Sequence, residues 1–413
     1  MSKPTPGQQY VIVSGDTLGS IAARAYGDST FSSRIQSANP SITSPDNIVV
    51  GQTVIIPVLS ERELLKTQLT DLTLKNESAT GLRVLLEGVN IEPISVTITR
   101  TMDTCADGWV ATIPHDTESL IYEKTAPYRY TPVAVYIGGN LVVNGVLCTS
   151  APSLATDRSI ALTGYSYTID LVDSTIQPPY QRDNITLDQL AQSLVTPIGI
   201  NAVINGDTGG AFDRITAEKT NTLFTHLLKY ARQRGFLVTN TNAGDLLLTQ
   251  ANTEGKSVGT LQEGDGVVLS WGAEFDGRKR FNTYTALGQS PKSNKNVSPA
   301  IDNAVPRSRF LTFTADDTTA GNVSQAAIWR RNSQVSKALN MSLPVRDWFD
   351  PSGNLWEPNM LVTIISKTIY IPEGFDMLIR AVDYNYSASG RSATLHVVPP
   401  QVYTSQEIIE PWD

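Results

Sequence analysis

The chain has 413 residues, too many for one hydrophobic core, because single cores stop growing near ~250 residues, so about three domains are expected. Its 40 acidic and 32 basic residues give a net charge of -8, which disfavours a specific nucleic-acid partner, because neutralising phosphates requires clustered lysine and arginine. No run approaches the ~18 apolar residues of a membrane span, so we expect no membrane insertion, and residues 1–9 lack the apolar run of a secretory signal.

Residues 10–57 read as a compact unit of their own. A β-branched run at residues 10–13 precedes a turn at residues 14–17 that offers a helix N-cap. Apolar residues at positions 18, 21, 22 and 25 then have helical spacing and predict a short amphipathic helix closed by Gly27. A second short helix is predicted over residues 31–38, and a strand over residues 53–56. The predicted order is strand, helix, helix, strand.

This segment resembles a LysM module through its opening YVIVSGDTL at residues 10–18, the turn Ala38-Asn39-Pro40, and the closing GQTVIIP at residues 51–57. The resemblance implies binding of N-acetylglucosamine polymers in a groove between the loop before the first helix and the loop after the second. That groove, for a glycan or a protein partner, would consist of Gly15, Asp16, Thr17, Leu18, Asn39, Pro40, Ser41 and Ile42. Most of the matched residues are also caps, turns and core that a LysM without ligand would need, and docking on a partner protein is the favoured alternative.

Residues 59–68 form a charged linker, and strands are predicted beyond it. Residues 94–100 and 109–113 alternate apolar and polar side chains with a period of two. Residues 133–137 and 141–147 predict a hairpin around Gly138-Gly139-Asn140, with a further break at Asn144-Gly145. Residues 159–167 and 169–172 continue as strands. Residues 69–176 are therefore expected to form a first antiparallel β-barrel-like domain.

Residues 177–255 predict a small α+β domain. Thr186 and Gln189 form a capping-box pattern ahead of a helix that stops at Pro197. A second helix over residues 220–234 ends at Gly235, and residues 236–239 and 245–249 follow as a hairpin.

Residues 256–405 are expected to form a second β-barrel-like domain, with strands at 267–271, 281–287, 310–314, 339–343, 361–366, 378–386 and 393–398. A polar loop over residues 291–306 and a helix over residues 322–338 interrupt these strands, and residues 406–413 form a tail. The predicted fold class is α+β, mainly β, with an N-terminal LysM of βααβ order, two antiparallel β-barrel-like domains and an α+β domain.

The sequence predicts no catalytic, cofactor-binding or metal site. His115, His226 and His396 have no paired spacing, and Cys105 and Cys148 do not form a CxxC pattern. Structural roles are expected for His226, His396 and Cys148, and the chain is predicted not to be an enzyme. A wall-degrading enzyme fused to LysM is a weaker alternative, because no acid and base pair is visible.

The region after residue 68 resembles the Mu-type bacteriophage tail protein, the baseplate hub. The resemblance rests on the spacing from Thr220 to Gly235, on the hairpin that follows, on WFDPSGNLWEPNMLVTI at residues 348–364, and on Ile137-Gly138-Gly139. It implies a homotrimeric ring in which each subunit supplies two similar β-barrels. That ring would join the tail tube protein to the central spike protein and contact other baseplate proteins.

The same resemblance implies a place in the virion tail baseplate, after assembly in the host bacterial cytoplasm. The Mu-type hub lacks a LysM module, so the role of this module does not follow from it. Docking in the baseplate and contact with peptidoglycan both stay open. The alternative is a cell-wall binding protein that recognises N-acetylglucosamine polymers and carries a display scaffold.

Overall fold

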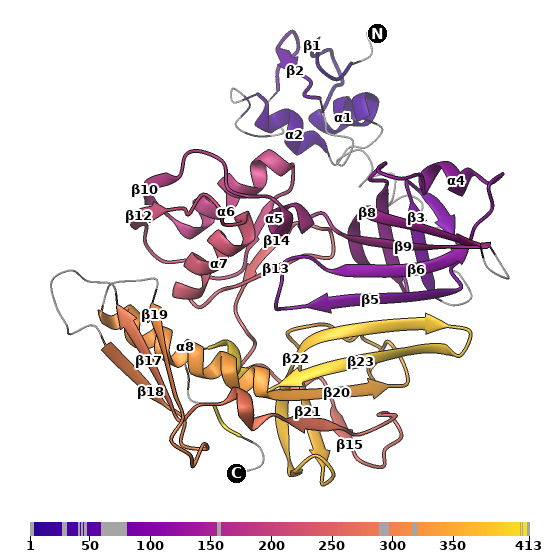
Figure 1. Ribbon diagram of the computed structural model, residues 1–413. Coiled ribbons are helices and arrows are strands. Elements are labelled where there is room, and N and C mark those ends of the chain that lie inside the picture. The colour runs from indigo at the N-terminus through magenta and orange to yellow at the C-terminus, as the bar shows by residue number, and fades with distance from the viewer. Residues whose placement is uncertain are drawn as a thin grey trace. The chain divides into compact units, whose positions relative to one another are not determined.

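The computed structural model describes residues 4–26, 31–39, 42, 44, 48–58, 81–154, 158–288, 297–315, 320–404, 406 and 408–410 (Figure 1). The predicted linker over residues 59–68 lies outside these ranges. The chain divides into a smaller compact unit, residues 1–90 with 136–140, and a larger one, residues 91–135 with 141–413.

The LysM segment has the predicted order of elements: β1 (Gln9–Val11), α1 (Leu18–Tyr26), α2 (Ser32–Ser37) and β2 (Thr53–Ile55). β1 and β2 pair antiparallel, with Tyr10 opposite Val54. The inward residues of both helices and both strands form a core of their own, which includes Leu18, Ile21 and Ile35. The predicted helix spacing is confirmed. The smaller unit also contains β3 (Leu82–Leu86) and β4 (Val89–Ile91).

The larger unit is organised around one main sheet, of order β16-β20-β23-β22-β5-β6-β9-β8-β7. Its strands are β5 (Ser95–Thr101), β6 (Gly108–Pro114), β7 (Pro132–Ile137), β8 (Asn140–Leu154), β9 (Arg158–Ser166), β16 (Ala273–Phe275), β20 (Leu339–Val345), β22 (Ile371–Ser387) and β23 (Gly390–Val398). β15 (Thr260–Gln262) pairs parallel with β21 (Leu361–Ser366), and β21 pairs antiparallel with β22 of the main sheet. The short helix α4 (Leu120–Lys124) follows β6.

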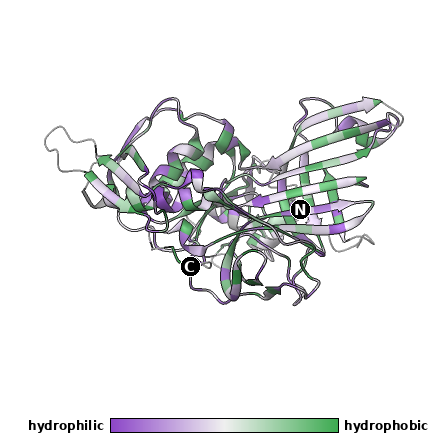
Figure 2. Ribbon diagram, turned by 60° about the horizontal axis from the view of Figure 1, so that its bottom comes forward, coloured by the Kyte–Doolittle hydropathy of each residue, from purple (hydrophilic) through white to green (hydrophobic). Residues whose placement is uncertain are grey.

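The mainly β fold class is confirmed, and the two strand-rich regions of the sequence share this sheet, because β5 pairs with β22 from Val96 to Thr101. Figure 2 shows apolar and polar residues alternating along many of the strands, as expected where one face is buried.

Three predicted elements differ in the structure. The break at Asn144-Gly145 is wrong, because β8 continues through it to Leu154. Residues 169–172 are helical, in α5 (Ile169–Asp173), because Leu171 packs into the core shared with α7. Residues 267–271 make an isolated bridge with β20, where Pro344 accepts a hydrogen bond from Leu269 but has no N–H to return.

An α+β region lies between the two runs of strands. The parallel pair β11 (Ala202–Ile204) and β14 (Leu246–Thr249) is completed by β13 (Leu237–Asn240), and β10 (Gln181–Ile185) pairs with β12 (Phe212–Thr216). α6 (Leu187–Val195), which the 3-10 turn η2 (Thr196–Ile198) extends, and α7 (Leu223–Gln233) share the core. The predicted capping box is confirmed, since Thr186 and Gln189 each accept a hydrogen bond from the other's backbone.

A smaller sheet of order β18-β17-β19 packs against the long helix α8 (Ala320–Ala338) (Figure 1). Its strands are β17 (Thr283–Gly288), β18 (Val297–Ile301) and β19 (Phe310–Ala315). The prediction of a loop over residues 291–306 is therefore wrong for residues 297–301, which form β18. Residues 291–296 lie outside the described ranges. The short turns η3 (Gly277–Lys279) and η4 (Pro400–Tyr403) adjoin α8. No helix among the described residues is long and apolar enough to cross a membrane.

His226 predicts a pH dependence of stability. Its side chain is buried on α7, where burial, aided by the charges of Lys229 and Arg182, lowers its pKa from 6.5 to about 4. The fold therefore favours the neutral ring. The contribution of His226 to stability is fully present above pH 6.5 and is lost as the pH falls towards 4. We expect the free energy of unfolding to fall over this window, and to fall less in His226→Gln. Urea titrations of the wild type and of His226→Gln at pH 7, 6, 5 and 4.5 measure this free energy. If it falls equally with pH in both proteins, His226 is not the cause.

Candidate functional site

Asp16, the acidic residue of the predicted LysM groove, holds the fold of the LysM segment. Its carboxylate accepts hydrogen bonds from the Tyr10 hydroxyl at 2.8 Å and from the Val13 backbone at 3.0 Å, and forms an ion pair with Arg24. Although burial raises the pKa of Asp16, these partners lower it below its ordinary value. Only 6% of its side chain is exposed, so little of it is available to a ligand.

Asn39 ties the end of α2 to β2. Its amide nitrogen donates to the carbonyls of Ile35 and Ile55, and its oxygen accepts from the Ile55 N–H. Leu18 and Ile42 are core residues, so Gly15 and Thr17 are the exposed members of the predicted groove within the described part. Pro40 and Ser41 lie outside the described residues. The groove therefore stays a prediction, and most of its described side chains hold the two loops in place.

We expect Asp16→Ala to destabilise the LysM segment by about 1.5–2 kcal/mol, because it removes hydrogen bonds to a charged group. Arg24 is one-third exposed and is able to turn to solvent, which limits the loss. Amide hydrogen exchange of α1 measures the effect in the full chain. The exposed neighbour Ser14, replaced by alanine, is the control; equal exchange in both variants would remove the structural role of Asp16.

The LysM segment also exposes apolar side chains. Val11 and Ile55 lie on the outer side of its two strands, while Val49 and Val50 lie in the turn before β2. Val49 and Val50 are each 64% exposed. Adjacent exposed apolar side chains are more typical of a protein-docking surface than of a purely solvated one.

A polar cluster, buried at its centre, joins the main sheet to the turn between β13 and β14. We call it the hairpin junction, and it consists of Arg100, Asp107, Asn144, Asn240, Asn242 and Glu357. Arg100 on β5 contacts Asp107 at 3.1 Å, Glu357 at 3.0 Å and the Asn242 oxygen at 2.6 Å. Asn240 donates to Asp107, and Asn144 on β8 donates to the Ala243 carbonyl. Four separate parts of the chain, around residues 100–107, 144, 240–243 and 357, are thereby joined.

His396 takes part in a chain of hydrogen bonds across three strands of the main sheet. Ser342 Oγ lies 2.8 Å from His396 Nδ1, and His396 Nε2 lies 2.8 Å from Asp383 Oδ2. In catalytic triads the nucleophile faces Nε2 and the carboxylate faces Nδ1, so the imidazole here has the reverse orientation. Although burial raises the pKa of Asp383, the hydrogen bonds from His396 and Thr99 lower it. The geometry is that of a cross-strand ladder.

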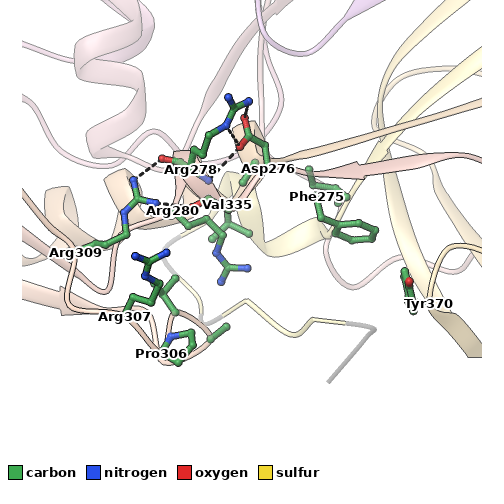
Figure 3. A pocket seen from close by; sticks show the side chains of 14 residues that line it. Phe275, Asp276, Arg278, Arg280, Pro306, Arg307, Arg309, Val335 and Tyr370 are labelled. Atoms are coloured by element: carbon green, nitrogen blue, oxygen red, sulfur yellow. Dashed lines mark hydrogen bonds and ion pairs between the residues drawn. The ribbon is translucent and has the colours of Figure 1, made fainter.

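The larger unit has a pocket of about 760 Å³ between β16, η3, the loop before β19 and α8 (Figure 3). Phe275, Val335, Leu339 and Tyr370 give it apolar walls, and arginines stand at its edge. We call it the basic pocket. Its residues come from separate parts of the sequence, so no local motif marked it.

Two further observations bear on chemistry. Among the described residues, no group of three His, Cys, Asp or Glu side chains could hold a metal ion. Burial raises the pKa of the Cys105 thiol to about 12, which leaves this cysteine protonated at neutral pH and unreactive.

Three family models match the chain: LysM domain at residues 10–57, baseplate hub protein gp44-like second domain at 168–250, and Mu phage baseplate assembly protein GpP fourth domain at 318–406. Over the two matched hub domains the chain is similar to Mu-type baseplate hub proteins, and it carries a LysM domain. The chain is 28% identical over 246 residues to the baseplate hub protein gp44 of Escherichia phage Mu. This match covers 55% of the chain and 64% of the Mu protein, slightly less than two thirds of that relative.

Solved tail proteins have a similar fold. The 43 kDa tail protein of prophage MuSo2 from Shewanella oneidensis has a TM-score of 0.69 at 27% identity, and the match covers 78% of this chain and 98% of that one. The tail protein from Neisseria meningitidis MC58 has a TM-score of 0.69 at 18% identity, covering 79% and 98%. The predicted resemblance to the Mu-type hub, and the predicted LysM module, are confirmed.

Proposed function

We propose that this protein is a structural component of the baseplate of a contractile phage tail. The single observation that carries the proposal is the ordered match of the gp44-like second domain and the GpP fourth domain within one chain. The shared main sheet is consistent with it, because a rigid adapter needs its domains fixed to one another. We keep the predicted domain boundaries at 58, 68, 176, 255 and 405 as part of this proposal.

In finer detail, we propose a homotrimer that joins the tail tube protein to the central spike protein and has no catalytic activity. Mass photometry of the purified chain, alone and mixed with the tube and spike proteins of the same phage, tests this. We expect a mass of three chains and a larger complex with each partner. A chain that stays monomeric and binds neither protein would contradict the hub function.

For the LysM domain we propose docking on another baseplate protein. The exposed Val49 and Val50 support docking, whereas Asp16 and Asn39 are engaged within the fold. We expect Val49→Ser/Val50→Ser to weaken recruitment of the chain to isolated baseplates that lack it, with the exposed Ser14→Ala as control. Recruitment at the wild-type level would overturn this role.

The second candidate function is binding to peptidoglycan, favoured by the LysM match at residues 10–57. Cosedimentation of the full chain with purified peptidoglycan, compared with a chain lacking residues 1–58, separates the two candidates. Binding that disappears with residues 1–58 would support a cell-wall binding protein with a display scaffold. Equal sedimentation of both chains would remove the glycan role.

A further inference from the structure

The apolar walls of the basic pocket have an exposed aromatic pair. Phe275 on β16 and Tyr370 before β22 meet edge to face, with ring centroids 6.1 Å apart. They are 41% and 66% exposed, which is unusual for adjacent aromatic rings on a free surface. Val335 and Leu339 complete the apolar wall from α8 and β20. A pocket with such walls accepts an aliphatic or aromatic side chain.

Two of the arginines at the edge of the pocket have no carboxylate partner among the described residues. Four arginines line the pocket in all. Of these, Arg280 is paired with Asp302 and Glu410, and Arg278 is paired with Asp276. Arg309 donates to the backbone carbonyls of Gly277 and Arg278, and within the described part of the chain neither it nor Arg307 has a carboxylate partner. Figure 3 shows Arg307 and Arg309 on one side of the pocket and Phe275 and Tyr370 on the other. In a chain of net charge -8, this edge favours an acidic ligand.

A segment of the same chain has the complementary chemistry. The short helix α4 buries none of its residues, and its Leu120 is 76% and its Tyr122 is 47% exposed. Exposed carboxylates flank these apolar side chains on both sides: Asp116, Glu118 and Glu123. We call residues 116–124 the acidic α4 segment. None of its residues lines the basic pocket.

We propose that the acidic α4 segment of one copy docks in the basic pocket of a second copy. Leu120 or Tyr122 would enter between Phe275 and Leu339, and Glu118 and Glu123 would face Arg307 and Arg309. Because the two surfaces differ, the contact is head to tail, and contacts of this kind close into rings when the rotation permits. The inference rests on the proposed trimer and names the surfaces that would join its subunits.

Charge reversal tests the pairing. Arg307→Glu/Arg309→Glu and Glu118→Arg/Glu123→Arg are each expected to weaken self-association by about tenfold or more, because like charges then face each other. The variant with all four changes is expected to recover it. Exposed Lys256→Glu is the matched control. Sedimentation velocity over a concentration series measures association, and circular dichroism at 222 nm checks folding.

A disulfide test does not depend on the charges. In a Cys148→Ser background, Leu120→Cys/Tyr370→Cys is expected to give covalent dimers and trimers on mild oxidation, while each single cysteine gives no trimer. If the wild-type chain is a trimer, but both charge-reversal variants associate equally well and the double-cysteine variant forms no disulfide between subunits, the proposed surfaces are wrong. The proposed hub function would still stand. Loss of tube-protein binding with self-association intact would assign the pocket to the tube protein instead. A wild-type chain that is monomeric and binds no tail protein would overturn both proposals.

Discussion

Replacing Arg100 by methionine is expected to destabilise the larger unit by about 3–5 kcal/mol, because one partner of a buried ion pair would be left without its counter-charge. The side chains of Arg100 and Asp107 are 8% and 2% exposed. Burial opposes the charge on Arg100, but Asp107 and Glu357 hold its pKa above its ordinary value. Methionine keeps the length of the side chain, so the loss reports mainly the missing charge and hydrogen bonds.

The matched control for this prediction is Arg214→Met. Arg214 pairs with Asp183 at 2.7 Å, but both side chains are more than half exposed, and surface pairs of this kind contribute little to stability because solvent screens them. All six tryptophans lie beyond residue 90, so tryptophan fluorescence during urea unfolding reports the larger unit. Similar losses for Arg100→Met and Arg214→Met would show that the hairpin junction does not fix the sheet to the hairpin.

Replacing Gly145 by alanine is expected to cost about 3 kcal/mol or more, at the upper end of the range for overpacked sites. A Cβ at Gly145 would lie 1.8 Å from the Tyr165 carbonyl oxygen and 2.6 Å from the Ser166 Cα. Both atoms belong to the backbone of β9, so no side chain is able to move aside. The two strands would have to separate, and the ladder between Gly145 and Ser166 would weaken.

Gly272→Ala is the control, because an added Cβ there meets no atom within 4 Å and the φ of Gly272 lies outside the left-handed region. The same fluorescence measurement applies. We expect near-wild-type stability for Gly272→Ala and a clear loss for Gly145→Ala. Equal stability of the two variants would mean that β8 and β9 separate at Gly145 at little cost, which would contradict the prediction.

Local sequence patterns predicted the elements whose stabilising contacts lie nearby in the chain. The LysM order of elements follows from the spacing of Leu18 and Ile21 and from the strand ending at Pro57, and the capping box of α6 involves only Thr186 and Gln189. The hairpin at Gly138-Gly139 needs positive φ, which glycine adopts without strain. The family resemblance, confirmed by the comparisons, underlies the proposed function. No local pattern distinguished a glycan groove from a docking surface.

The errors occurred where distant contacts override local preference. Gly145 predicted a break because an isolated glycine in a strand usually marks one, but here it allows β9 to approach. Residues 169–172 alternate like a strand, yet packing of Leu171 on the core of α7 makes them helical. The Ser342–His396–Asp383 chain of hydrogen bonds joins three strands and has no sequence spacing of its own.

By itself the sequence determined the LysM module, the mainly β fold class and the absence of a recognisable catalytic motif, because each depends on residues close together in the chain. Only the tertiary structure decided that Arg100, Asn242 and Glu357 meet in one junction, and that Arg307 and Arg309 line the edge of an apolar pocket. Such sites depend on the pairing of strands far apart in the sequence, and the energy that fixes this pairing comes from the whole core.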